Sequence, residues 1–246
     1  MAIDKKSQIT LMLLMAIFIL IIAGFIIFLS DYFKKNEVES LVFEKFSIES
    51  YINGCVKKTA EDALKLLGKQ GGLIILQEHL QTPNFGVAYH LYNNQDTVPS
   101  IEKMQDELSF YMKNNLDVCL KGFEDFKNQG WVVEKSDIEA KTQVNEHDVA
   151  FDVDYPIKVS DKGSTISFDR FTSRLNVRLK YIHAIVDYIV EFTAVYKNHI
   201  DLTSLNEYNV NVTAFFYDSS LVYVLEDPKS LITSEPYKFI FALKLD

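Results

Sequence analysis

The sequence predicts an α+β protein in which an N-terminal transmembrane helix and a helical segment precede a mixed antiparallel sheet with one long helix. Three patterns support this fold class, in chain order: an uncharged apolar stretch, a region of helical periodicity, and a region in which apolar and polar residues alternate as in strands. The predicted strands are grouped together and do not follow one helix each, which favours α+β over α/β. We expect four parts: a short basic N-terminus or signal at 1–8, a transmembrane helix at 9–29, a mainly helical region at 36–130, and an α+β domain at 131–246.

Residues 9–29 contain no charged side chain. As a helix they would be about 31 Å long, which matches the roughly 30 Å hydrocarbon core of a bilayer. A cleaved secretory signal has a shorter apolar core, of about 7 to 15 residues. We therefore expect a single-pass protein of the cell membrane, with the lipid bilayer as one of its partners.

The first amphipathic helix of the 36–130 region is predicted by apolar residues at helical spacing over 38–67. Gly68 or the Gly71-Gly72 pair would end it. The helix either continues from the apolar stretch or begins anew near residue 47. We favour a break, because one helix over 9–67 would be roughly 88 Å long.

The second amphipathic helix is predicted to begin after Ser100, a good N-cap, with an apolar stripe over 101–126 that closes at Gly130. Residues 73–76 are apolar and are expected to form a strand or a buried linker. Residues 77–99 are rich in Pro, Gly and Asn, and we expect a loop there.

Strand patterns dominate the α+β domain. Residues 138–144 and 149–155 alternate apolar with polar side chains, which predicts a hairpin with a four-residue connection. Pro156 indicates that the second strand ends there or lies at an edge. The remaining predicted elements are a helix over 175–196 and three strands, at 210–217, 221–225 and 237–245.

The charge balance argues against nucleic acid as a partner. The chain has 25 Lys and Arg against 34 Asp and Glu, a formal net charge of −9. Such a surface is repelled by phosphate backbones, and no basic stripe with interleaved aromatic residues reverses this locally.

Cys55 and Cys119 are the only cysteines, and each lies on the apolar stripe of a predicted helix. They are disulfide candidates; the alternative is two buried free thiols. Asn211, in Asn211-Val212-Thr213, is a candidate for N-glycosylation. Together the two features favour an extracellular C-terminal domain.

The sequence predicts no catalytic, cofactor-binding or metal-binding residues, and no cofactor. Neither cysteine has a neighbouring His, and the histidines lack the spacing of a helical metal site. An enzyme would need a polar pocket that contains two or more of the following histidines: His79, His90, His147 and His183.

The segment Lys5-Lys6-Ser7-Gln8-Ile9-Thr10 before the apolar stretch resembles the class III signal of archaeal type IV pilin-like proteins. This resemblance implies cleavage between Ser7 and Gln8, and a filament core built from residues 9–29. The chain departs from the family at Ser7, where Gly or Ala is usual, and at Met12, where the family has an acidic residue. An uncut anchor is the alternative.

The rest of the chain is similar to uncharacterised single-pass surface proteins of small-genome archaea, through Tyr51–Val56, Lys69–Gly72 and Tyr155-Pro156. We expect a membrane-anchored structural or interaction protein of the archaeal cell envelope, for which a pilin-like subunit is one form. Its expected partners are other envelope or pilus-like proteins, or further copies of itself. The alternatives are an accessory subunit of a secretion or transport complex and an anchored hydrolase.

Overall fold

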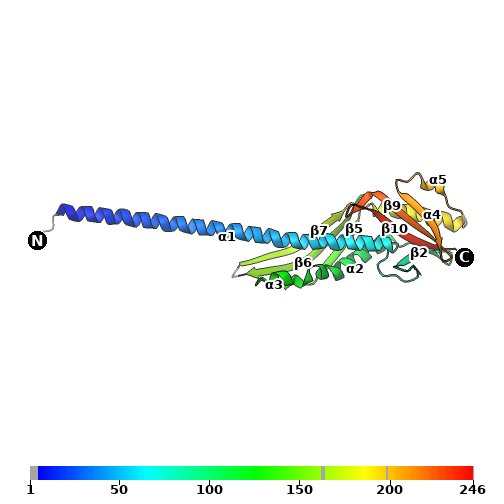
Figure 1. Ribbon diagram of the computed structural model, residues 1–246, viewed down its shortest axis with the longest axis horizontal. Coiled ribbons are helices and arrows are strands. Elements are labelled where there is room, and N and C mark those ends of the chain that lie inside the picture. The colour runs from blue at the N-terminus through cyan, green and yellow to red at the C-terminus, as the bar shows by residue number, and fades with distance from the viewer. Residues whose placement is uncertain (1–4, 162–163, 198, 246) are drawn as a thin grey trace. The chain divides into compact units, whose positions relative to one another are not determined.

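The computed structural model describes residues 5–161, 164–197 and 199–245, and the side chains of this part except those of 5–14, 16, 30–44 and 202. The chain divides into two compact units, Met1–Ser50 and Tyr51–Asp246. Figure 1 shows the chain, with many of the elements labelled, and the fold class is α+β.

Helix α1 (Lys5–Lys69) supplies the first unit and continues into the second. Every residue in this range is helical, so the break that we predicted near residue 47 is wrong. The helix ends where the glycines predict: Gly71 and Gly72 have φ values of +75° and +87°, and the Gly72 N–H donates to the Leu67 carbonyl at 2.8 Å.

Within the described part of the chain, no helix combines the length and the apolar character needed to cross a membrane. The predicted transmembrane helix at 9–29 is therefore wrong. The same holds for the predicted single-pass placement in the cell membrane with an extracellular C-terminal domain.

The larger sheet has the strand order β1-β2-β10-β9-β8, with β3 also paired to β2. Its pairs are antiparallel except for β2 with β10, which run parallel. The bounds are β1 (His79–Gln81), β2 (Gly86–Tyr92), β3 (Gln95–Asp96), β8 (Asn211–Tyr217), β9 (Ser220–Ile232) and β10 (Glu235–Lys244).

Three of these strands lie within 77–99, so the predicted loop there is wrong. The turn-forming residues of this range connect short strands: Asn93 and Asn94, both with positive φ, link β2 to β3. Residues 73–76, in contrast, form no strand.

The smaller sheet is antiparallel and consists of β4 (Val132–Lys135), β5 (Glu139–Val144), β6 (Val149–Asp161) and β7 (Ser164–Leu175). The predicted hairpin is present, with Val144 opposite Val149. Strand β6 pairs with β7 along one edge and with β5 and then β4 along the other.

Pro156 neither ends β6 nor places it at an edge, which corrects that prediction. The register of β6 against β7 shifts between Asp154 and Ile157, so the proline lies at an irregularity where its missing N–H is tolerated. Its carbonyl accepts a hydrogen bond from the Ser136 N–H at 3.0 Å.

The remaining helices are α2 (Ile101–Cys119), the 3-10 turn η1 (Lys121–Phe123), α3 (Glu124–Lys127), α4 (Leu179–Val195) and α5 (Leu202–Leu205). Ser100 caps α2 as predicted, because its side chain accepts from the Lys103 N–H at 3.2 Å. Helices α2 and α4 each bury one apolar stripe, which includes Met104 and Leu108 in α2 and Ile182 and Ile189 in α4.

Candidate functional site

Strand β5 has a free edge that helix α2 covers. The Gln105 side chain accepts from the Val144 N–H at 2.9 Å, and the Ser109 hydroxyl accepts from the Thr142 N–H at 2.9 Å. Gln105 and Ser109 are four residues apart, so both lie on one face of α2. Two backbone donors of this edge, those of Thr142 and Val144, are thereby satisfied and cannot pair with another strand.

Strand β7 lies at an outer edge of the same sheet and is protected differently. Its exposed positions carry hydroxyl or charged side chains, namely Thr165, Ser167, Asp169, Arg170, Thr172 and Arg174. Charged and polar side chains of this kind discourage edge-to-edge pairing.

Strand β8 is the outer strand of the larger sheet, and it differs from β7 in having no charged side chain; its exposed polar positions are Asn211 and Thr213. Phe215, Phe216 and Tyr217 are 45%, 72% and 36% exposed. No residue from Tyr208 to Tyr217 is charged. Among the residues that the structure describes, no hydrogen bond reaches the outer edge of β8, whose backbone groups pair only with β9. This open, uncharged edge, Asn211–Tyr217, is the candidate functional site.

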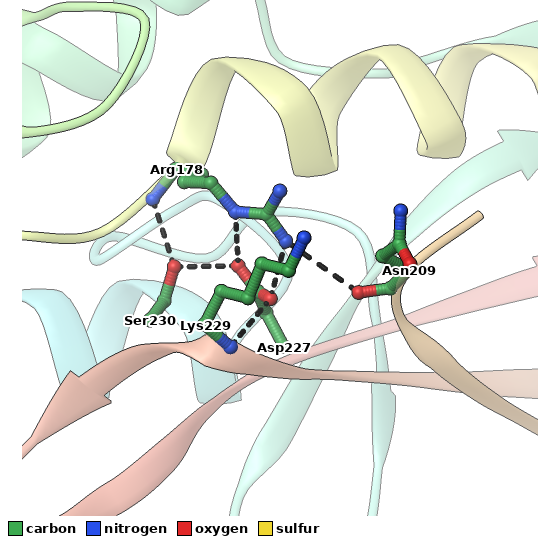
Figure 2. A network of polar contacts seen from close by, with 5 residues as sticks. All are labelled: Arg178, Asn209, Asp227, Lys229 and Ser230. Carbon is green, nitrogen blue, oxygen red and sulfur yellow. Dashed lines mark hydrogen bonds and ion pairs between the residues drawn. The ribbon is translucent and has the colours of Figure 1, made fainter.

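A buried polar network stabilises the same sheet (Figure 2). Arg178, just before α4, donates from Nε and Nη2 to the two carboxylate oxygens of Asp227 at 3.0 and 2.6 Å. Asp227 also accepts from the Ser230 hydroxyl at 2.5 Å and from the Lys229 N–H at 3.0 Å. Burial opposes ionisation of Asp227, but the hydrogen bonds from Arg178, Ser230 and Lys229 outweigh it and lower its pKa.

This network fixes the position of β9, and therefore that of β8, which pairs with β9. The register between β9 and β10 passes from Asp227 opposite Tyr237 to Leu231 opposite Pro236, so residues 228–230 bulge from the ladder. The Arg178 N–H donates to the Ser230 hydroxyl at 2.9 Å, which joins the start of α4 to the bulge. Arg178 Nη2 also lies 3.5 Å from the Asn209 carbonyl, two residues before β8. The role of the network is structural.

A polar groove around Asp117 is the main candidate for acid-base chemistry. Lys135 Nζ contacts both carboxylate oxygens of Asp117 at 2.5 Å, and the Tyr155 hydroxyl donates to one of them at 3.1 Å. Burial and the charge of Asp117 raise the pKa of Tyr155, so the phenol stays protonated. These groups satisfy one another, and we assign no catalytic role to them.

The structure joins Cys55 and Cys119 in a disulfide, with Cα atoms 5.6 Å apart. Asn211 is exposed at the start of β8. The predicted cleavage residues Ser7 and Gln8 are helical positions of α1, and their side chains lie outside the described ones. Residues 1–4 of the predicted N-terminal signal also lie outside the described residues.

The four histidines lie on different elements of the fold. His90 is fully buried in β2, where its Nε2 donates to the Gly71 carbonyl at 2.8 Å. His183 Nε2 donates to the Pro99 carbonyl at 2.9 Å, whereas His79 is partly exposed and His147 is exposed in the β5–β6 turn. The pockets around Lys69, Asp117 and Glu134 contain no histidine. The described residues contain no group of three His, Cys, Asp or Glu side chains arranged to hold a metal ion.

Sequence reasoning identified β8 as a strand but not its exposure. Adjacent Phe215 and Phe216 must point to opposite faces of a strand, which is the local signal that one aromatic ring is uncovered. Comparisons of the chain with protein-family models, curated proteins and solved structures found no match.

Proposed function

We propose that this chain is a non-enzymatic interaction protein that assembles with a second copy of itself through the outer edge of β8. The observation that carries the proposal is the open edge of Asn211–Tyr217, which combines unpaired backbone groups with exposed aromatic side chains. Addition of a strand to such an edge provides main-chain hydrogen bonds, and side chains on the shared face provide specificity.

Charge favours a second copy as the occupant. The chain has a net charge of −9, so most of its surfaces repel a copy of themselves. The uncharged segment Tyr208–Tyr217 lacks this repulsion. Strand β7 contrasts with it, because its exposed positions include Asp169, Arg170 and Arg174.

Two-fold symmetry sets the register of this contact. An antiparallel pair that uses all of Asn211–Tyr217 places Ala214 opposite its own copy, and Phe216 opposite Val212. Aromatic and β-branched side chains opposite each other stabilise antiparallel pairs. The contact thus buries the most exposed aromatic ring of β8 against an apolar partner.

Site-specific cross-linking of the full chain tests this register. In the proposed pair, the Cβ atoms of the two Ala214 residues are about 5 Å apart. The Ala214→Cys variant adds a single free thiol, because Cys55 and Cys119 are bonded to each other. We expect a short bis-maleimide to convert this variant to a covalent dimer on a denaturing gel, and we expect no dimer from Ser167→Cys on the exposed face of β7.

Adding Phe216→Lys to Ala214→Cys should abolish the cross-link, whereas adding Thr172→Lys, a matched exposed strand position on β7, should not. Equal cross-linking of Ala214→Cys and Ser167→Cys would overturn the proposal. So would a cross-link that persists with Phe216→Lys, or one that forms only to a different protein.

A further inference from the structure

A pocket of about 340 Å³ lies within the second unit, between the end of α1 and the β9–β10 hairpin. Its volume is at the lower end of the range for ligand sites, which suits a small molecule. Apolar side chains form much of its lining: Phe85, Ile232, Pro236 and Ile240.

One wall of this pocket is cationic. Lys65 and Lys69 are one helical turn apart on α1, and both line the pocket. Among the described residues neither has a carboxylate partner: Lys65 donates to the Thr233 hydroxyl at 2.6 Å, and the Lys69 ammonium lies 4.3 Å from the centre of the Phe85 ring.

The neighbouring lysines of the same helix behave differently. Lys57 and Lys58 lie 4.0 and 3.3 Å from the carboxylates of Glu61 and Asp62, one turn further along.

Lys238 and Glu235 also line the pocket, and Lys238 is paired with Glu226 at 3.3 Å. Lys65 and Lys69 outnumber the one lining carboxylate, Glu235, so the pocket keeps an excess of positive charge in a chain with a net charge of −9.

We infer that this pocket binds an aliphatic monocarboxylate, with its carboxylate between Lys65 and Lys69 and its hydrocarbon chain along Ile232, Pro236 and Ile240. Ammonium groups at a pocket mouth stabilise a carboxylate by charge-assisted hydrogen bonds. The apolar lining stabilises the chain by removing it from water. This inference is independent of the β8 contact, because no residue of β8 lines the pocket.

Decanoate is the probe, and the δ1-methyl resonance of Ile240 in the full chain is the readout, assigned with the Ile240→Val variant. We expect saturable shifts of this resonance with decanoate. The Lys65→Gln/Lys69→Gln variant should bind decanoate about tenfold more weakly, because each ammonium contributes a charge-assisted hydrogen bond. Lys58→Gln, on the same helix, should bind as the unmodified chain does.

Two further ligands distinguish the contribution of the carboxylate charge from that of the hydrocarbon chain. We expect 1-decanol, which has the chain without the charge, to bind about tenfold more weakly than decanoate, and inorganic phosphate to leave the Ile240 resonance unchanged. Lys69 is in the last turn of α1, where a cation also stabilises the helix, so binding and not stability is the deciding measurement. Equal affinity for decanol and decanoate, or unchanged decanoate affinity in the double variant, would overturn the inference.

Discussion

Arg178 and Asp227, 49 positions apart in the chain, form an ion pair in which the Asp227 carboxylate has no exposed surface and Arg178 is 18% exposed. Both carboxylate oxygens are engaged, so the charge of Asp227 is compensated inside the protein (Figure 2). The pair fixes the start of α4 against the bulge in β9.

Removal of the arginine should be severely destabilising. Arg178→Met leaves the buried Asp227 carboxylate without its cation, and we expect a loss of about 3–5 kcal/mol in the free energy of unfolding, measured by urea denaturation. Arg170→Met is the matched control, because Arg170 and Asp154 form an exposed pair, with side chains 71% and 59% exposed. Similar midpoints for the two variants would contradict the role that we assign to Arg178.

His90 should make the fold sensitive to acid. Burial of its ring lowers its pKa from 6.5 to about 4, although the hydrogen bond to Gly71 opposes this shift. The unfolded chain therefore binds a proton between about pH 6.5 and pH 4 that the folded chain does not. Stability falls by roughly 3 kcal/mol as the pH drops through this window.

Denaturation curves at a series of pH values measure this effect. We expect His90→Gln, which keeps a donor for the Gly71 carbonyl, to flatten the pH dependence between pH 6.5 and pH 4. His147→Gln, in the exposed β5–β6 turn, should leave it unchanged. An identical slope in the chain with and without His90 would refute the assignment.

The Cys55–Cys119 disulfide should contribute about 4 kcal/mol, as the chain-entropy model gives for a sequence separation of 64 residues. We expect Cys55→Ser/Cys119→Ser to lower the free energy of unfolding by this amount in thermal denaturation. A reducing agent should lower the stability of the unmodified chain to a similar extent. It should have no effect on the double variant, and a further loss there would show that the reductant acts elsewhere.

Glu107 should hold the segment after α1 in place. Its Oε2 accepts from the N–H groups of Ile74 and Ile75 at 3.0 and 2.9 Å, while Lys103 Nζ contacts its other oxygen at 2.8 Å. In Glu107→Ala these two amides lose their acceptor, so we expect faster hydrogen exchange at Ile74 and Ile75. Asp106→Ala, an exposed neighbour on α2, should leave both rates unchanged.

Sequence patterns correctly predicted the elements that are determined by neighbouring residues. Ser100 marked the start of α2, because a cap and an apolar stripe coincide there, and the β5–β6 hairpin followed from alternation on both sides of a polar turn. The short strands β1 to β3 were not predicted. Strand β2 is fixed by its parallel pairing with β10, whose residues are far away in the sequence, so no local pattern marks it. The prediction from Pro156 was wrong for a related reason. The proline lies at an irregular position of β6 that depends on the three strands paired with β6, and two of them lie outside the hairpin that the local pattern predicts.

The candidate site was harder to predict than the fold. The exposure of Phe216 depends on which face of the sheet other elements cover, and no window around β8 contains that information. Arg178 and Asp227 likewise have no local signature, since Asp227-Pro228 resembles a turn and the partner lies 49 residues earlier. Lys65 and Lys69 have the spacing of an ordinary solvated helix face.

The parallel pairing of β2 with β10 also orders events during synthesis. Leu91 pairs with Leu243, so the ribosome completes β2 long before β10 exists. During that interval His90 lacks Phe241, on which its ring later stacks with centroids 4.7 Å apart. The apolar sheet around β2 therefore stays incomplete until β10 has been synthesised.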